Sequence, residues 1–297
     1  MTPAEVWPVA ISHPEGVIRG LGVGPQTRPP DLVMLHANGF CASLYAPILA
    51  RLAPDFTAVA LDLRGHGRTE LPTPLAGFHT WRGYAADMAF ALQELVPKGA
   101  RAPVLSGHSL GGMVSLLTTE LSPASVERLV LFDPVVLNPK IHWMARLPLM
   151  RRLGKRTPLA LGALKRRADF PSRAAVVESY AKRKAFANWA PGLLEAYVDQ
   201  GFVDRPDGTV TLACRPEWEA ATFGAQGQDT WGVLARCKRP VRLFAAEEGS
   251  TVYGGVERVA RVAPKVVASM VAKGTHFFPL EQPDVIEAAW REALAGR

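Results

Sequence analysis

One short run of the sequence carries the clearest chemical signal. From position 107 to 112 it reads Gly-His-Ser-Leu-Gly-Gly, which contains the pattern Gly-x-Ser-x-Gly around Ser109. The run directly follows the apolar Pro-Val-Leu of 103–105 and precedes a helical pattern. A serine at such a sharp strand-to-helix turn is exposed at the end of a sheet, and the glycines let the backbone pass close to itself. The pattern predicts a nucleophilic serine; a surface serine in a tight glycine turn is the alternative.

A serine hydroxyl becomes a good nucleophile only when a base removes its proton and a carboxylate orients that base. The sequence offers seven histidines as candidates for the base. His108 adjoins the serine, but neighbouring side chains at such a turn point apart. His36 and His66 lie in glycine-containing turns, which favours a role in holding those loops by hydrogen bonds. Three others have no matching context: His13, His79 and His142.

The segments around these residues alternate between strand-like and helix-like patterns. Short apolar runs predict strands at 32–36, 56–61, 104–106 and 126–132. Helical patterns lie between them at 44–52, 84–96 and 110–121. This alternation predicts a mostly parallel sheet covered by helices on both faces, with a site at the carboxyl ends of the strands. The same rhythm returns later in the chain, with strands at 241–246 and 265–271 and a helix at 283–294.

The middle of the chain has a different character. From about 137 to 231 the pattern is helical and lacks the strand rhythm, which predicts an inserted helical lid rich in aromatic residues. Between 138 and 185, thirteen Lys and Arg, such as Arg151 and Arg152, accompany only two acidic residues. Such a charge run is most often a solvated face, and a membrane-proximal role or an anionic substrate is the alternative.

With these residues in view, the sequence resembles the α/β-hydrolase superfamily, in particular its capped members. The run His-Ala-Asn-Gly-Phe at 36–40 sits where the family places a His-Gly-x loop after its third strand, although Ala37 stands where glycine is common. The run at 62–67 looks like the family's turn after the fourth strand. The resemblance implies an α/β-hydrolase fold, with a mostly parallel eight-stranded sheet and helices on both faces. It places the core at 1–136 and 232–297 and the helical cap at 137–231.

The resemblance also implies roles for individual residues. His276 follows the last strand and precedes the C-terminal helix, where this fold supplies its base; a histidine that only caps the loop is the alternative. The family usually takes its acid from the loop after the seventh strand, which here reads Ala-Glu-Glu-Gly at 246–249. Asp133, directly after the sixth strand, occupies the position used by some lactone hydrolases, dehalogenases and epoxide hydrolases. We favour Asp133 as the acid, with Glu247 or Glu248 as the alternative.

A tetrahedral intermediate needs two backbone N–H donors to stabilise its oxyanion. Leu110, the residue after the nucleophile, is expected to supply one of them. The second is expected from Asn38 in the loop after the third strand, with Gly39 as the alternative. Losing one such donor typically costs about 10²–10³ in rate.

The nucleophile type narrows the chemistry. Members of this superfamily that displace at an sp³ carbon use an aspartate, so a serine at 109 indicates acyl chemistry. We expect a serine hydrolase that cleaves a carboxylic ester or lactone of a small to medium hydrophobic substrate through an acyl-enzyme. The same machinery could instead cleave a carbon–carbon bond in a vinylogous diketone or transfer an acyl group, and a non-catalytic ligand receptor is a third hypothesis. No metal-ligand spacing, phosphate-binding loop or dinucleotide fingerprint occurs in the sequence, so no cofactor or metal is expected.

Composition sets the remaining limits. A chain of 297 residues, 48% hydrophobic and 21% charged, is neither disordered nor fibrous. Its net charge of +7 permits an anionic partner, but without a nucleic-acid reading motif we expect no nucleic-acid binding. A recognisable signal peptide is absent from the N-terminal residues, and the three cysteines are far apart in sequence, so we expect a cytoplasmic, reducing environment. The three are Cys41, Cys214 and Cys237.

Overall fold

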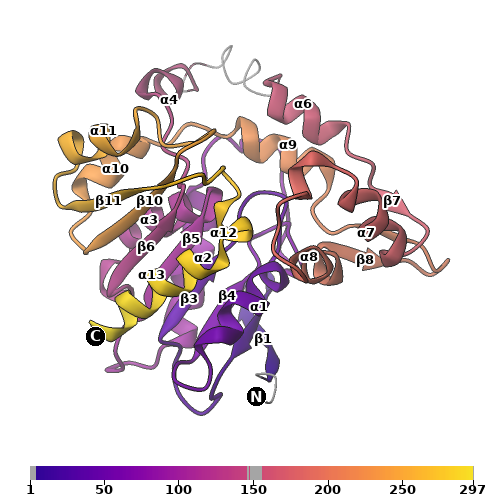
Figure 1. Ribbon diagram of the computed structural model, residues 1–297, viewed down its shortest axis with the longest axis horizontal. Helices are drawn as coiled ribbons and strands as arrows, with labels where there is room; N and C mark the ends of the chain where they lie inside the picture. The colour runs from indigo at the N-terminus through magenta and orange to yellow at the C-terminus, as the bar shows by residue number, and fades with distance from the viewer. Residues whose placement is uncertain (1–4, 146, 148–155, 297) are drawn as a thin grey trace.

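An eight-stranded sheet forms the centre of the molecule (Figure 1). The computed structural model describes residues 5–145, 147 and 156–296. The strand order is β1-β2-β4-β3-β5-β6-β10-β11. The six strands from β4 to β11 run parallel to one another, and β2 runs antiparallel to both of its neighbours, β1 and β4. The strands are β1 (Val6–His13), β2 (Gly16–Val23), β3 (Leu32–Leu35), β4 (Ala58–Leu61), β5 (Val104–His108), β6 (Arg128–Phe132), β10 (Val241–Ala246) and β11 (Val266–Val271).

The central strands are buried on both faces. Every residue of β3, β4 and β5 is buried, which explains why these strands appear in the sequence as continuous apolar runs. The hairpin of β1 and β2 was not predicted as strands. Its outer strand carries Pro8, which an edge strand tolerates because one side of the backbone has no ladder to complete.

Helices cover the two faces and pack on alternate residues of the same strands. Val33 belongs to the core on the face of α2 and α3, and the next residue, Met34, to the core on the face of α1 and α13. The predicted helix at 44–52 is a succession of three short helical pieces. The covering helices are α1 (Ala46–Leu49), α2 (Arg82–Leu95), α3 (Leu110–Leu121), α10 (Thr230–Arg236), α11 (Gly255–Val262) and α13 (Pro283–Ala295).

The segment between β6 and α10 contains several helices and also a three-stranded antiparallel sheet that was not predicted. Strands of two or three residues are too short to show an alternating pattern in the sequence. The elements are α4 (Pro139–Ala145), α6 (Pro158–Leu164), β7 (Asp169–Phe170), α7 (Arg173–Ala181), α8 (Leu193–Gly201), β8 (Phe202–Asp204), β9 (Val210–Leu212) and α9 (Pro216–Gly224). Arg151 and Arg152 lie outside the described residues.

The two ends of this segment, where the chain leaves the central sheet and returns to it, lie close together. The indole of Trp231, in α10, donates a hydrogen bond to the carbonyl of Leu137, 2.8 Å away, just before α4 begins. Within the described ranges, no helix has the length and apolar character needed to cross a membrane.

Candidate active site

Ser109 occupies a strained turn between β5 and α3. Its backbone has φ 56° and ψ −115°, which is unusual for a residue with a side chain. The turn is held by a hydrogen bond from the Ser109 N–H to the carbonyl of Phe132 at 3.0 Å. A Cβ at Gly107 would overlap the backbone of Gly111, and a Cβ at Gly111 would overlap the carbonyl of Leu35. The two outer glycines of the motif are therefore required by the close approach of α3 to β3 and β5.

The structure brings Ser109, His276 and Asp133 together. They come from the loops after β5, β11 and β6, which end at the same edge of the parallel sheet. The Ser109 Oγ lies 3.0 Å from His276 Nε2, and His276 Nδ1 lies 2.5 Å from Asp133 Oδ2. A carboxylate accepts, so Nδ1 carries the proton and Nε2 is left to accept the hydroxyl proton of Ser109.

Asp133 is fully buried and surrounded by donors. The backbone N–H of Ala246 donates to Oδ1 at 2.9 Å, and that of Thr251 donates to Oδ2 at 2.9 Å. The hydroxyl of Ser250 donates to Oδ1 at 2.5 Å. Burial would raise the pKa of Asp133, but His276, Ser250 and Ala246 together outweigh burial and lower the pKa below its ordinary value. Asp133 is therefore ionised at neutral pH and oriented toward the histidine.

The two alternative acids lie elsewhere. Glu247 is exposed and accepts the backbone N–H of Lys273 at 2.6 Å, and Glu248 is also exposed. In the described structure neither carboxylate contacts His276. The sequence analysis missed the role of Ser250 and Thr251, although hydroxyl residues just past the usual acid position were the available signal.

The loop at 36–40 is fixed from several sides. His36 accepts the N–H of Leu63 on Nε2 at 3.0 Å, so its Nδ1 donates to the carbonyl of Ala37 at 2.8 Å. His66 Nε2 lies 3.1 Å from Asn38 Oδ1. Burial lowers the pKa of His66 to about 4 and that of His36 well below its ordinary value. Both histidines hold loops, as predicted.

His108 links the loop of Ser109 to the loop of His276. Its Nε2 lies 2.8 Å from the carbonyl of His276, and its Nδ1 lies 2.7 Å from Tyr45 Oη. Burial, followed by the charge of His276, lowers the pKa of His108 to about 3. The ring is therefore neutral, so Nε2–H donates to the carbonyl and Nδ1 accepts the tyrosine proton. No local sequence pattern indicates the contact between Tyr45 and His108.

Residues of the inserted segment form hydrogen bonds with the 36–40 loop. The Nδ2 of Asn38 donates to the carbonyl of Glu219 at 3.1 Å, and the hydroxyl of Tyr197 donates to the carbonyl of Gly39 at 3.0 Å. Arg166 pairs with Glu219 through Nη1 and Oε2 at 2.5 Å, and its Nη2 lies 3.0 Å from Tyr197 Oη. The sequence analysis did not identify this buried polar cluster.

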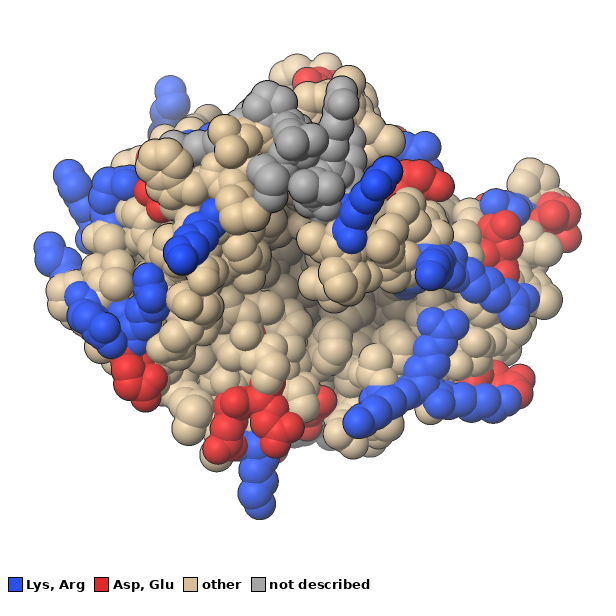
Figure 2. Space-filling view, turned by 90° about the horizontal axis from the view of Figure 1, so that it is seen from above, with Lys and Arg blue, Asp and Glu red and all other residues tan. Residues whose placement is uncertain are grey.

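Aromatic side chains form an apolar wall beside His276. Phe40 packs edge-on against Trp189 of the inserted segment, with ring centroids 5.5 Å apart, and lies 6.1 Å from Phe277. Figure 2 views this end of the molecule from above and shows a hollowed centre that is mostly neither acidic nor basic. Within the described residues, no group of three or more His, Cys, Asp or Glu could hold a metal ion.

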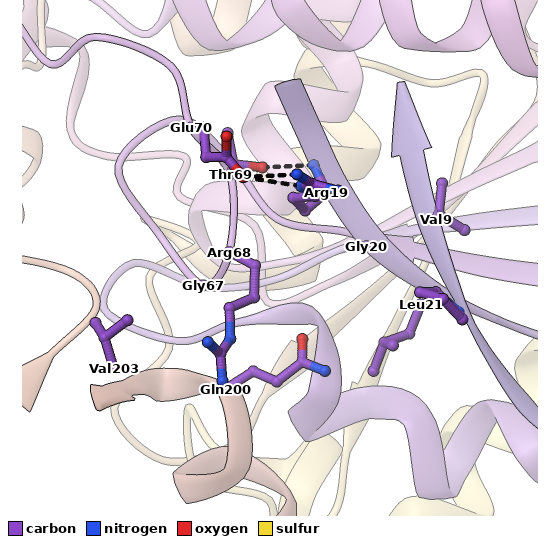
Figure 3. A pocket seen from close by; sticks show the side chains of 11 residues that line it. Val9, Arg19, Gly20, Leu21, Gly67, Arg68, Thr69, Glu70, Gln200 and Val203 are labelled. Atoms are coloured by element: carbon purple, nitrogen blue, oxygen red, sulfur yellow. Dashed lines mark hydrogen bonds and ion pairs between the residues drawn. The ribbon is translucent and has the colours of Figure 1, made fainter. Parts of the chain in front are cut away.

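A separate cavity of about 520 Å³ lies between the β1–β2 hairpin and the inserted segment (Figure 3). Arg19 and Glu70 form an ion pair across one side of it, with Nη2 and Oε1 2.7 Å apart. Gln200 and Val203 line it from the inserted segment. None of the predicted site residues is among those that line this cavity.

The fold agrees with what comparison of the sequence shows. Residues 32–289 match the alpha/beta hydrolase family, so the chain belongs to that family. The mostly parallel eight-stranded sheet with helices on both faces is the one expected from the resemblance noted in the sequence.

Individual relatives match only part of the chain. It is 35% identical over 100 residues to a pimeloyl-[acyl-carrier protein] methyl ester esterase of Pectobacterium carotovorum, covering 34% of this chain and 35% of that protein. It is 30% identical over 113 residues, 38% of each chain, to a 2-(acetamidomethylene)succinate hydrolase of Mesorhizobium japonicum. The matches thus span little more than a third of these relatives. The crystal structure of an E-2-(acetamidomethylene)succinate hydrolase superposes with a TM-score of 0.79 at 18% identity, covering 99% of this chain and all of that one, which shows a shared fold.

Proposed function

We propose that the protein is a serine hydrolase that cleaves a carboxylic ester or lactone of a small to medium hydrophobic substrate. One observation carries the proposal: Ser109 Oγ, the imidazole of His276 and the carboxylate of Asp133 form a continuous line of hydrogen bonds. Ser109 attacks the acyl carbonyl while His276 Nε2 takes its proton, and Asp133 stabilises the imidazolium that forms. His276 then protonates the leaving alkoxide, and water activated by the same imidazole releases the acid from the acyl-enzyme.

The oxyanion is stabilised by the N–H groups of Leu110 and Asn38 in this proposal. Leu110 is the first residue of α3, and the first N–H groups of a helix have no partner within it. In the opposite loop, two hydrogen bonds hold the side chain of Asn38: its Nδ2 donates to the carbonyl of Glu219, and its Oδ1 lies 3.1 Å from His66 Nε2. These contacts favour Asn38 over Gly39 as the second donor.

We assign residues 137–231 the role of a cap over this site. The wall of Phe40, Trp189 and Phe277 suits an apolar acyl or alcohol group better than a charged polymer. The names of the two relatives, a methyl ester esterase and a hydrolase, are consistent with acyl hydrolysis. The three cysteines are free thiols in the structure, which fits a reducing compartment such as the cytoplasm.

A fluorophosphonate probe tests the nucleophile directly. The folded wild-type protein should form one covalent adduct, located at Ser109 by peptide mass spectrometry, and the Ser109→Ala variant should form none. Ser125→Ala, which changes a half-buried serine just before β6, at the end of that strand opposite to Asp133, should label normally. A folded wild-type protein without an adduct at Ser109 would favour the non-catalytic receptor.

A substrate panel then separates the enzymatic alternatives. Aryl esters, lactones and vinylogous diketones are compared at equal concentration, with Ser109→Ala as the blank. Faster turnover of esters or lactones supports the proposal. Selective turnover of the diketones would assign carbon–carbon bond hydrolysis instead.

A further inference from the structure

Helix α6 turns its small side chains inward and its large apolar side chains outward. Ala160 and Ala163 are buried and pack against Ala220 and Phe223 of α9. Three leucines of the same helix are exposed: Leu159 (65%), Leu161 (41%) and Leu164 (47%). The alanines make the contact that fixes the helix, so the fold requires leucine at none of the three outward positions.

Helix α4 exposes apolar side chains at the same end of the molecule, at the top of Figure 1. Trp143, in α4, is 67% exposed, and Leu147, just after this helix, is 58% exposed. Single exposed apolar residues are ordinary, whereas a concentration of them marks an interaction surface. We call this surface the apical patch; its residues are Ile141, Trp143, Met144, Leu147, Leu159, Leu161 and Leu164.

Positive charge surrounds the apical patch. Lys140 lies in α4, and Arg156 and Lys165 flank α6; all three are exposed. Among the described residues between Asp133 and Asp169, five are Lys or Arg and none is acidic. Figure 2 looks onto this end and shows Lys and Arg projecting on both sides of the hollowed centre. The partner of this surface must therefore be both apolar and anionic.

We propose that the apical patch binds the surface of an anionic phospholipid bilayer. The leucines, methionine and tryptophan enter the boundary between headgroups and acyl chains, while the lysines and arginines contact lipid phosphates. An acidic protein would match the charge but would leave the outward leucines unexplained. A second copy of the chain would place two positively charged patches against each other. A bilayer satisfies both properties of the surface.

Two short connections link the apical patch to the proposed active site. Helix α4 begins six residues after Asp133. Arg166, two residues beyond the end of α6, pairs with Glu219, whose carbonyl accepts from Asn38. A bilayer on the patch would therefore present lipid-dissolved esters beside Ser109. The binding step itself does not depend on the proposed hydrolase activity.

Vesicle co-sedimentation tests the proposal. The full chain carrying Ser109→Ala, which cannot consume lipid through Ser109, is mixed with vesicles of phosphatidylcholine alone or with added phosphatidylglycerol. We expect binding to the anionic vesicles that weakens as salt is added, because the lysine and arginine contacts are screened. Equal partitioning into both kinds of vesicle, or into neither, would overturn the proposal.

Matched variants locate the surface. Leu159→Gln with Leu164→Gln should weaken binding by roughly tenfold, because two apolar side chains are lost from the lipid boundary. The control is Val267→Thr with Met270→Gln on β11, where the side chains are 57% and 55% exposed, and it should bind normally. Thermal unfolding verifies that both double variants remain folded. Equal loss of binding in the two would contradict the assignment.

Two double lysine variants and a measurement of the oligomeric state complete the test. Lys140→Gln with Lys165→Gln should weaken binding and reduce its salt dependence, whereas Lys98→Gln with Lys265→Gln, exposed elsewhere, should not. Size-exclusion chromatography is run without vesicles. A dimer that the leucine variant dissociates would show that a second copy covers the patch, and would refute the membrane assignment.

Discussion

Both carboxylate oxygens of Asp133 accept hydrogen bonds from more than one donor. Ala246 and Ser250 serve one oxygen, and Thr251 and His276 serve the other. The loop after β10, where the family usually places its acid, thus supplies donors to an acid held on the neighbouring strand. The carboxylate therefore comes from the loop after β6 and some of its hydrogen-bond donors from the loop after β10, and the carboxylate still contacts Nδ1 of His276.

This arrangement predicts a clear difference between two isosteric variants. Asp133→Asn should lower kcat by about 10³–10⁴-fold, because an amide stabilises the wrong histidine tautomer and cannot stabilise the imidazolium. Glu247→Gln should leave kcat unchanged, because its carboxylate contacts only the backbone of Lys273. Steady-state kinetics on an aryl ester measure both. Near-normal turnover by Asp133→Asn would refute the assigned acid.

The buried carboxyl group of Asp62 should make the stability of the protein depend on pH. It is fully buried and accepts the N–H groups of Ala42 and Arg68 at 2.7 and 2.9 Å. Burial raises its pKa from 3.8 to about 6, although these hydrogen bonds oppose the rise. The folded state therefore binds a proton that the unfolded state releases between about pH 4 and 6. Stability from this group is greatest below that window and falls as pH rises through it.

The Asp62→Asn variant isolates that contribution. The advantage of the wild type in free energy of unfolding should shrink by up to about 3 kcal/mol between pH 4 and pH 7, since only the wild-type side chain titrates. Urea unfolding of both proteins across this range measures the difference. A constant difference would show that burial does not raise the pKa of Asp62.

Among the elements, the junction of β5 and α3 has the least tolerance for added atoms. A Cβ at Gly111 would meet the backbone of Leu35 and His36, which cannot move without displacing β3. Gly111→Ala should therefore cost about 3 kcal/mol or more of stability. Gly83→Ala in α2 meets nothing within 4 Å and should gain about 0.5–1 kcal/mol. Chemical denaturation of the two variants tests whether the change in stability depends on the steric contact of the added Cβ rather than on the loss of glycine itself.

The elements that the sequence predicted well are those with a strong local period. The bounds of α3 and β10 agree with their predicted ranges, because long apolar runs ended by glycine or by a turn leave little freedom. The β1–β2 hairpin and the small sheet of the inserted segment went unpredicted, since short or mixed-polarity strands acquire their identity from the neighbours with which they pair.

The same contrast holds for the site. Ser109 was predicted from a local motif, and His276 from the resemblance to α/β-hydrolases, which place a histidine after the last strand. Ser250, Tyr45 and Arg166 contact the site from distant parts of the chain and belong to no local pattern. Only the folded structure brings such residues within reach.

At the level of the whole molecule, a buried ion pair lies inside the inserted segment, next to the place where that segment contacts the 36–40 loop of the core. The side chains of Arg166 and Glu219 are 18% and 8% exposed, and Glu219 also receives Asn38 on its carbonyl. Glu219→Gln should cost about 3 kcal/mol, because it leaves a largely buried guanidinium without its counter-charge. Glu178→Gln breaks the exposed pair with Lys182 and should cause no measurable change. Equal effects of the two in urea unfolding would mean that the buried pair does not stabilise the inserted segment.

The hydrogen bond between Trp231 and Leu137 has a consequence for how such proteins diversify. Because the chain departs from the sheet and rejoins it at neighbouring points, a recombination event could exchange everything between them as one module while the strands beneath kept their register. Chimaeras spliced at these two positions should therefore inherit the chemistry of the recipient and the substrate preference of the donor.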